Sequence, residues 1–440
     1  MNSLIYLFSC FVFTALGLWI GDARADEVSD LAILEEKIAA IVDPLVSEKL
    51  LPGYYLAIYA EDKLLVERAM GFADEKRQLR PTGDTLYAIA SMTKPLTAIA
   101  MLHLIENSEL TLDSEISDFL PAFASPMVAP DGSYDKQLVL AKTPITIRQL
   151  MTHTSGLTYS STVTGVGDIA DAYRDLEILT LEASAESRLG NLGDHIDSLA
   201  ELPLVAHPGT EFNYSVGYDV LARIIEVVSK KTFETYLKEY VLDPLGMTDT
   251  KYLLEAEDTA RLAQLYAPLI RTIQVPGTPK RYQKTNMLPR GQRNFGEQLG
   301  MVSGGSGLIS SANDYARFLS FLMNRGEGFS KVLSQEHFDM LLKDQTGKSF
   351  GTDLMVESLG AQTRNMVFSL ALGIRLDSSE DQVGEAEYDF LGWAGAFDTQ
   401  FWLDPSNGTF GVFMAQHTPS RYRVTEGIEE AVDIFMSSSN

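Results

Sequence analysis

The sequence predicts an α/β (α+β) protein in which one antiparallel β-sheet is flanked by terminal helices and carries an inserted, mainly helical domain. Strand-like alternation of apolar and polar residues occurs near both ends of the chain, within 54–72 and within 368–416. The stretch between them, 108–299, is mostly helical or loop-like. A single sheet assembled from both chain ends is the economical way to bury all of these strands. With 440 residues, 45% of them hydrophobic, the core can be large enough to need no disulfides.

The N-terminal part predicts a helix, a hairpin and a second helix. Residues 29–50 show helical periodicity with mixed charge. Strands are expected at Tyr54–Tyr59 and Leu64–Phe72, because Glu61-Asp62-Lys63 between them is a hairpin signal. An apolar helical pattern then begins at Ser91 and predicts a helix over 91–107.

The rest of the chain predicts short helices first and strands later. Helical patterns in the middle of the chain occupy Thr146–His153, Ser215–Ser229 and Phe233–Val241. Strand signals return at Phe368–Leu376, Thr399–Leu403 and Phe410–Gln416, with a turn at Asp404–Gly408 and a closing helix at Thr425–Met436. We therefore expect a sheet domain of residues 26–107 and 300–440, a helical domain of residues 108–299, and an active site at their interface.

The first 25 residues are typical of an export signal. Leu4 to Ile20 is an uncharged, largely apolar run, and Ala23-Arg24-Ala25 is a small-residue cleavage signal before Asp26. The run is long and no basic residue precedes it, so an uncleaved N-terminal anchor stays open as the alternative. We expect a bacterial protein that is exported to the periplasm or secreted, with membrane contact only if this segment is retained.

Composition excludes several classes of function. The net charge of −25 would repel nucleic acid. Cys10 is the only cysteine and lies in the apolar run, so the mature chain has no disulfide, thiol catalysis or cysteine metal site. The six histidines are scattered without the spacing of a ligand pair. No metal or other cofactor is expected.

The most informative motif is Ser91-Met92-Thr93-Lys94 at the start of the predicted helix. Residues at i and i+3 are neighbours on one helix face, so the Lys94 ammonium can lie against the Ser91 hydroxyl. A serine is a poor nucleophile until a neighbour takes its proton, and a cation with a helix N-terminus favours the alkoxide. A second S-x-x-K at Ser133–Lys136 follows the turn signal Pro130-Asp131-Gly132, and we interpret it as a loop.

Several ordered segments resemble the serine β-lactamase/penicillin-binding-protein-like hydrolases, in the branch of class C β-lactamases, D-Ala-D-Ala carboxypeptidases and family VIII carboxylesterases. Ser91 to Lys94 matches the nucleophile motif of that superfamily. The other matching segments are Leu150–Leu157, Pro208–Ser215, Asp243–Met247, Ser303–Leu308 and Asp314–Ala316. The resemblance, which runs from about residue 30 to 435, implies a β-lactamase/transpeptidase-like fold. It also implies that Tyr214 is a catalytic residue with Ser91 and Lys94.

Two motifs depart from the β-lactamase pattern in ways that bear on the substrate. Where class C enzymes have Tyr-x-Asn, this chain has Tyr214-Ser215-Val216, and where they have Lys-Thr-Gly it has Trp393-Ala394-Gly395. Tryptophan cannot replace the charge-assisted contact of a lysine with a substrate carboxylate. Val216 and Trp393 are therefore expected to form an apolar substrate-binding wall together with Ala394 and Gly395.

The resemblance assigns the oxyanion hole to the backbone N–H groups of Ser91 and Ala396. It also implies that His153, although it lies in a matching segment, is structural and not a catalytic base. We expect Lys94 and Tyr214 to act as one proton-transfer unit, since no histidine or metal constellation competes with them.

The sequence thus predicts an exported serine hydrolase that cleaves acyl esters through an acyl-enzyme on Ser91. The alternatives are a β-lactamase, a D-Ala-D-Ala carboxypeptidase or D-aminopeptidase, or a poorly catalytic penicillin-binding sensor. The partner is a small ester, β-lactam or peptide. Residues 271–293 contain six basic residues and no acid. They are interpreted as a solvated loop, with a positive rim beside the active site as the alternative.

Overall fold

The computed structural model describes residues 25–129, 133, 137–160, 165, 167–175, 191–268, 282–285, 302–346, 366–376 and 388–438. Its centre is a seven-stranded antiparallel sheet with the strand order β2-β1-β13-β12-β11-β10-β9. The strands are β1 (Gly53–Ala60), β2 (Lys63–Gly71), β9 (Met366–Phe368), β10 (Gly373–Leu376), β11 (Tyr388–Gly395), β12 (Thr399–Asp404) and β13 (Thr409–Met414). The predicted fold class is confirmed.

The sheet joins the two ends of the chain side by side. β1 pairs with β2 through the predicted hairpin, whose turn residues Glu61 and Asp62 both have positive φ. On its other side β1 pairs with β13, with Tyr55 opposite Met414. The strand signals near both ends of the chain therefore belong to one shared sheet, in which every residue of β12 and β13 is buried.

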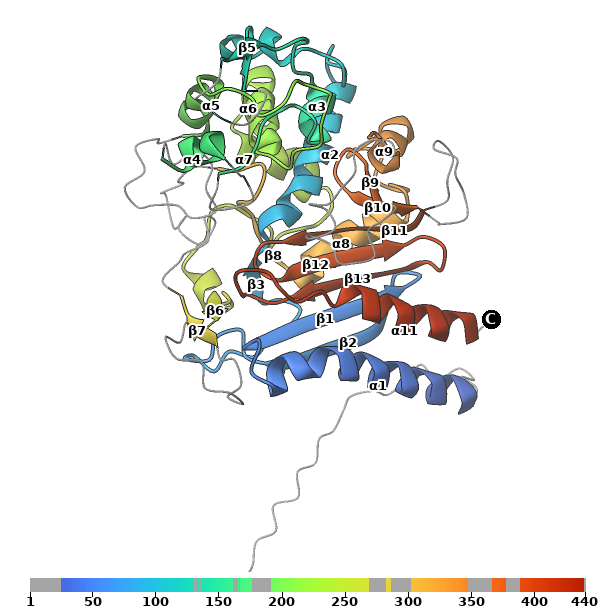
Figure 1. The fold of residues 1–440 in the computed structure, drawn as a ribbon. Helices are drawn as coiled ribbons and strands as arrows, with labels where there is room; N and C mark the ends of the chain where they lie inside the picture. The colour runs from blue at the N-terminus through green and yellow to red at the C-terminus, as the bar shows by residue number, and fades with distance from the viewer. Residues whose placement is uncertain are drawn as a thin grey trace, which may run out of the picture.

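One face of the sheet is covered by the two terminal helices, α1 (Ala25–Ser47) and α11 (Thr425–Ser438), which lie side by side in Figure 1. Apolar residues of both helices, such as Ile38 and Ile428, form one buried cluster with the sheet residues Tyr54 and Trp402. The other face packs against α8 (Ala312–Met323) and the much larger second core.

The helix that follows the nucleophile motif is surrounded by protein on all sides. It begins at Thr93, two residues later than predicted, and ends at Glu106 as α2. A 3₁₀ turn, η1 (Ala90–Met92), precedes it and contains Ser91. Of the residues from Thr93 to Ile105, all but His103 are buried. A helix that is apolar on every face is typical of the centre of a protein.

The mainly helical part of the chain lies over α2 (Figure 1). Its elements are β4 (Met127–Val128), β5 (Val139–Leu140), α3 (Ile147–Met151), α4 (Asp168–Asp175), α5 (Leu192–Ala200), α6 (Gly217–Ser229), α7 (Phe233–Leu237) and the π-helical turn η4 (Lys238–Leu242). The Thr146 side chain caps α3 by accepting from the Gln149 N–H, and the Gln149 side chain accepts from the Thr146 N–H.

The segment after this helical part returns to the sheet side of the molecule. Isolated bridges join Lys251 to Ile309, Leu262 to Leu86 and Tyr266 to His417. The remaining elements are β3 (Leu86–Ala88), β6 (Tyr266–Pro268), β7 (Tyr282–Lys284), β8 (Ile309–Ser311) and α9 (Gln335–Leu342), with short 3₁₀ turns at Ile116–Asp118, Pro121–Phe123 and Glu257–Ala260. Residues 251–268 thus pair with the sheet domain, although they fall inside the range that the sequence assigns to the helical domain.

The predicted strand at Phe368–Leu376 is in fact two strands, β9 and β10, separated by a turn at Ser369–Leu372. Ser369 forms that turn, since its hydroxyl accepts from the N–H groups of Ala371 and Leu372. Residues 1–24 of the proposed export segment, and all but 282–285 of the basic stretch 271–293, lie outside the described residues. In the described part of the chain, no helix has the length and apolar character needed to cross a membrane.

Candidate active site

Ser91 sits where the chain turns from strand to helix. The turn is held by two backbone bonds, Ile89 N–H to Leu308 C=O (3.1 Å) and Met92 N–H to Ile89 C=O (3.1 Å). Ala90, directly before Ser91, has φ +44°, in the left-handed region that non-glycine residues avoid. Ser91 itself is partly exposed, while its neighbours Ala90 and Met92 are buried. The turn therefore presents the hydroxyl at the surface of an otherwise closed core.

Lys94 lies under that hydroxyl and is fully buried, with 0% of its surface exposed. Its Nζ donates to Ser91 Oγ (3.1 Å) and to the Gly305 carbonyl (2.8 Å). One turn further along α2, Thr97 Oγ1 donates to the Gly304 carbonyl (2.7 Å). These contacts fix the side chain of Lys94 and attach the 303–308 segment to α2.

The glycines of that segment allow its close approach. A Cβ on Gly304 would lie 2.3 Å from the Tyr218 carbonyl oxygen, and one on Gly305 would lie 2.9 Å from Asp219 Oδ2. Asp219 Oδ1 accepts from Ser303 Oγ (2.5 Å) and from the Gly305 N–H (3.4 Å). The sequence identified this segment as a match but gave no role to the Gly305 carbonyl, because a main-chain acceptor has no signature in residue type.

Three tyrosine rings surround the Lys94 ammonium. Its Nζ lies 4.7 Å from the ring centre of Tyr214, 5.4 Å from that of Tyr159 and 5.9 Å from that of Tyr218. Aromatic faces attract a desolvated cation. The Tyr214 hydroxyl makes no hydrogen bond to another described residue, so the contact between Lys94 and Tyr214 is through the ring. Of these rings, only Tyr214 was assigned a site role from the sequence.

His153 lies behind Tyr214 and is not placed to serve as a base. It is fully buried, its ring centre is 4.5 Å from that of Tyr214, and its Nδ1 accepts from the Ser215 N–H (3.2 Å). Burial first, and the nearby Lys94 charge second, hold the pKa of His153 well below its usual value of 6.5. A neutral imidazole packed among aromatic rings agrees with the structural role expected for this segment.

The last residues of β11 border the site from the sheet side. Trp393 is only 4% exposed, and its ring centre lies 5.7 Å from that of Tyr214 and 5.2 Å from that of Phe368. Its buried Nε1 makes no hydrogen bond in the described structure. Ala394 is partly exposed. A Cβ on Gly395 would lie 2.4 Å from the Ile89 carbonyl oxygen, so only glycine lets the strand reach the Ser91 turn.

The residues that carry the two expected oxyanion-hole donors belong to segments that pack together. Ala90 and Phe397 share one small buried cluster, and Ala396 packs against it. Val216 is placed differently from expectation. It lies one residue before α6 and is 0% exposed. Its side chain packs in the main core and does not line an accessible surface.

Comparison with known proteins decides the family. A family model described as "Beta-lactamase" matches residues 38–432. The chain belongs to the beta-lactamase family. It is 30% identical over 395 residues to "Protein Rv1367c" of Mycobacterium tuberculosis, covering 84% of this chain and 87% of that protein. It is 28% identical over 392 residues to "Esterase EstB" of Burkholderia gladioli, covering 86% and 89%.

Solved structures agree on the fold of this family member. One neighbour is "EstCE1, a hydrolase with promiscuous acyltransferase activity", with a TM-score of 0.71, 22% identity and coverage of 92% of this chain and 99% of that one. Family membership and the esterase relative identify this chain as a serine hydrolase of the esterase-like type.

Two other features of this beta-lactamase-family member, its possible metal ligands and the second S-x-x-K motif, do not form an alternative site within the described residues. Among the described residues, no cluster of three or more histidine, cysteine or carboxylate side chains is arranged to hold a metal ion. Ser133 of the second S-x-x-K is a hydrogen-bond donor to Asp168 (2.9 Å), whereas Lys136 lies outside the described residues.

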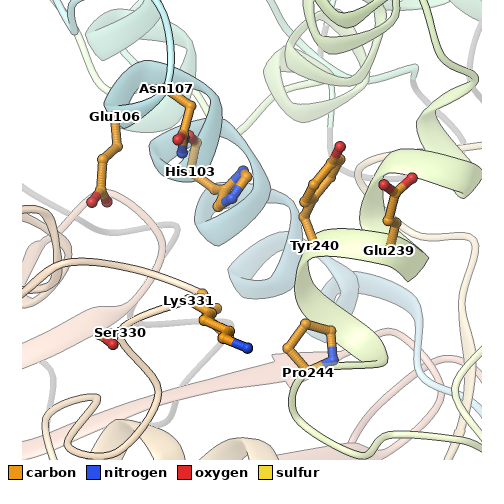
Figure 2. A pocket seen from close by; sticks show the side chains of 9 residues that line it. His103, Glu106, Asn107, Glu239, Tyr240, Pro244, Ser330 and Lys331 are labelled. Carbon is orange, nitrogen blue, oxygen red and sulfur yellow. Dashed lines mark hydrogen bonds between the residues drawn. The ribbon is translucent and has the colours of Figure 1, made fainter.

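A pocket of about 400 Å³ lies at the opposite end of α2 from Ser91. Figure 2 shows His103, Glu106 and Asn107 of α2 on one side, Tyr240 and Pro244 on another, and the 330–332 loop opposite. Nine residues separate Lys94 from His103, which is about 14 Å along a helix. The pocket is therefore separate from the candidate active site.

Proposed function

We propose that this serine hydrolase cleaves neutral acyl esters through a covalent acyl-enzyme on Ser91, and that it acts after export from the cytoplasm. The observation that carries the proposal is the buried Lys94, whose Nζ bridges Ser91 Oγ and the Gly305 carbonyl. A buried cation against a partly exposed serine is the arrangement that activates a hydroxyl without histidine. The esterase relative supports the substrate class, and residues 1–25 support export.

In the proposed reaction, Ser91 Oγ attacks the ester carbonyl carbon and its proton passes to the Tyr214 oxygen. The positive charge of Lys94 stabilises the negative charge that passes between the two oxygens during this transfer. The carbonyl oxygen becomes an oxyanion that accepts from the backbone N–H groups of Ser91 and Ala396. As the tetrahedral adduct collapses, the alcohol leaves with the proton from Tyr214. Water then attacks the acyl carbon and gives a proton to the Tyr214 oxygen. The Ser91 oxygen leaves the second tetrahedral adduct with that proton, which restores its hydroxyl and releases the carboxylic acid.

Trp393, at the position where the β-lactamase motif has lysine, favours esters over β-lactams. A lysine at this position would hold a substrate carboxylate, and a lost charge-assisted hydrogen bond costs about 1.5–3 kcal/mol. That corresponds to about 10- to 150-fold in discrimination. Tyr214 and Phe368, whose rings flank Trp393, offer no replacement cation.

The test compares kcat/KM for p-nitrophenyl butyrate with that for the β-lactam nitrocefin and for a D-Ala-D-Ala peptide. We expect the ester to be preferred at least 10-fold. Trp393→Lys should shift the ratio toward nitrocefin, and Trp393→Phe, which keeps an aromatic ring in the core, should not. Equal turnover of nitrocefin by the native enzyme would show that another cation binds the carboxylate. Acylation by nitrocefin without turnover of any substrate would instead indicate a penicillin-binding sensor.

A further inference from the structure

Two adjacent buried residues at the end of β13 connect the two halves of the proposed oxyanion hole. Gln416 and His417 are 2% and 0% exposed, and neither was singled out by the sequence. Gln416 bonds the nucleophile side: its Oε1 accepts from the Ala88 N–H (2.7 Å) and its Nε2 donates to the Ala88 carbonyl (3.2 Å). Ala88 is the last residue of β3 and lies three residues before Ser91, so this pair of bonds fixes the backbone that leads into the Ser91 turn.

His417 bonds the other side, through Asp398. Its Nδ1 lies 3.1 Å from Asp398 Oδ2, and because a carboxylate can only accept, the ring nitrogen is the donor. The His417 N–H donates to the Phe397 carbonyl (3.1 Å). Asp398 is 0% exposed and lies two residues after Ala396, in the turn between β11 and β12.

Asp398 anchors that turn with more than one contact. Its Oδ1 accepts from Ser420 Oγ (2.8 Å), from the Arg421 N–H (2.8 Å) and from the Tyr422 N–H (3.1 Å). Its own backbone has φ +58°, a left-handed conformation that tertiary contacts must maintain. A buried carboxylate with this many donors fixes the turn in one position, since bonds to an ionised acceptor are about twice as strong as neutral ones.

We propose that Asp398, His417 and Gln416 are positioning residues that set the spacing between the backbone N–H groups of Ser91 and Ala396. This inference rests on the proposed acyl transfer at Ser91 and adds the residues that hold its oxyanion hole in shape. Gln416 and His417, which follow β13, bond to the two segments that lead to the donors, through Ala88 and Asp398 respectively. A displacement of one turn therefore changes the separation of the donors without touching the substrate-binding surface.

The chain provides a matched control on the same strand. Asp404 also forms a turn at an end of β12, accepting from the Ser406 N–H (2.9 Å), Ser406 Oγ (2.5 Å) and Asn407 Nδ2 (2.7 Å). It is 7% exposed and lies about 20 Å along the strand from Asp398. Asp398→Asn and Asp404→Asn thus make the same chemical change at the two ends of β12, but only the turn of Asp398 leads to Ala396.

The experiment measures kcat and KM on p-nitrophenyl butyrate, with active sites counted by a phosphonate that labels Ser91. Removing an oxyanion donor costs about 10²–10³ in kcat, and a displaced donor costs less, so Asp398→Asn should lower kcat about 10- to 100-fold. KM should change less than about twofold, because ground-state binding does not use the hole. The Ki of a boronic acid, whose adduct is tetrahedral, should rise by the same factor as kcat falls. Asp404→Asn should leave all three quantities near the native values.

A second pair of variants separates positioning from folding. His417→Leu should reproduce the Asp398→Asn defect, and His417→Asn, whose amide can donate from about the position of Nδ1, should restore most of the activity. If Asp398→Asn does not fold, this pair decides alone. Equal behaviour of the two aspartate variants, or a kcat loss without the matching change in boronate Ki, overturns the inference and leaves the proposed function standing. If the native enzyme neither labels at Ser91 nor hydrolyses the ester, the proposed function itself fails and the inference with it.

Discussion

The two ends of α2 show opposite ways in which this protein uses polar side chains. At the N-terminal end, Lys94 is wholly buried, and no carboxylate of the described residues pairs with it; it bonds a serine and a main-chain carbonyl. At the C-terminal end, the pocket of Figure 2 is open, and two of the polar side chains of α2 that line it have local partners. His103 Nδ1 lies 2.8 Å from the Tyr236 hydroxyl, and Glu106 accepts from the Ser334 N–H (2.9 Å).

The difference shows that the volume of a pocket does not by itself locate the proposed active site in this protein. A buried, unpaired charge is costly, and a protein retains one where it does work that a neutral group cannot do. The pocket at the far end has a volume of about 400 Å³, and none of the charged residues that line it is buried. Three predictions test this contrast between the two ends.

The largest effect is expected at Ser91. Ser91→Ala should reduce ester hydrolysis on the order of 10³-fold or more, because the covalent step is lost. His103→Ala, at the other end of the same helix, should leave kcat/KM within about twofold of the native value. The measurement is steady-state hydrolysis of p-nitrophenyl butyrate, together with mass-spectrometric mapping of a phosphonate label. A label on Ser133, Ser155 or Ser215 would contradict the assignment of the nucleophile, and a large loss in His103→Ala would remove the contrast.

A smaller but still severe effect is expected at Lys94 and Tyr214. Lys94→Met keeps the buried volume and Tyr214→Phe keeps the ring, and each should cost about 10²–10⁴-fold, the usual range for positioned proton transfer. The double variant should be little worse than the more damaged single variant, since members of one unit are not additive. EDTA should have no effect on the native enzyme. Losses that multiply would show that the two residues act independently.

The smallest effect is expected on stability, at Glu429, a mostly buried carboxyl to which we assign no catalytic role. Burial raises the pKa of Glu429, on α11, to about 7, against the opposing effect of Arg375 (3.0 Å). The folded state thus binds this proton more tightly than the unfolded chain, whose carboxyl has a pKa of 4.5. The associated stability is present below about pH 4.5 and is lost as the pH rises through 7.

The expected loss of unfolding free energy is on the order of 2–3 kcal/mol between pH 4.5 and pH 8. Urea unfolding of the native protein and of Glu429→Gln, measured at both pH values, checks this. The variant should show a smaller decrease and native hydrolysis rates at pH 7, because α11 covers the sheet face away from Ser91. An identical pH dependence in both proteins would contradict the role of Glu429.

The sequence was sufficient for the parts of the structure that depend on residue type and spacing. The i, i+3 spacing predicts the contact between Ser91 and Lys94, and alternation with turn residues predicts the β1–β2 hairpin and the β12–β13 pair. The predicted start of α2 is two residues too early, because a 3₁₀ turn at Ala90–Met92 precedes the helix. That turn contains the strained backbone of Ala90. No periodicity indicates such a turn.

What the sequence could not show lies mostly in main-chain and tertiary contacts. The Gly305 carbonyl is an acceptor that any residue type could supply. Tyr159 and His417 reach the site region through packing between segments far apart in the chain. Val216 aligns with a substrate-binding position but is buried here, because alignment gives a position in the motif and not the direction of the side chain.

The pairing of β1 with β13 has a consequence for how the chain folds. The hairpin β1–β2 is synthesised first, while its partner strand lies close to the C-terminus. Until that strand arrives, the edge of β1 exposes unpaired N–H and C=O groups, which are prone to pair with other chains. Contacts between such distant segments also form slowly. Completion of the sheet must therefore wait until β13 has left the ribosome, and aggregation competes with folding during that interval.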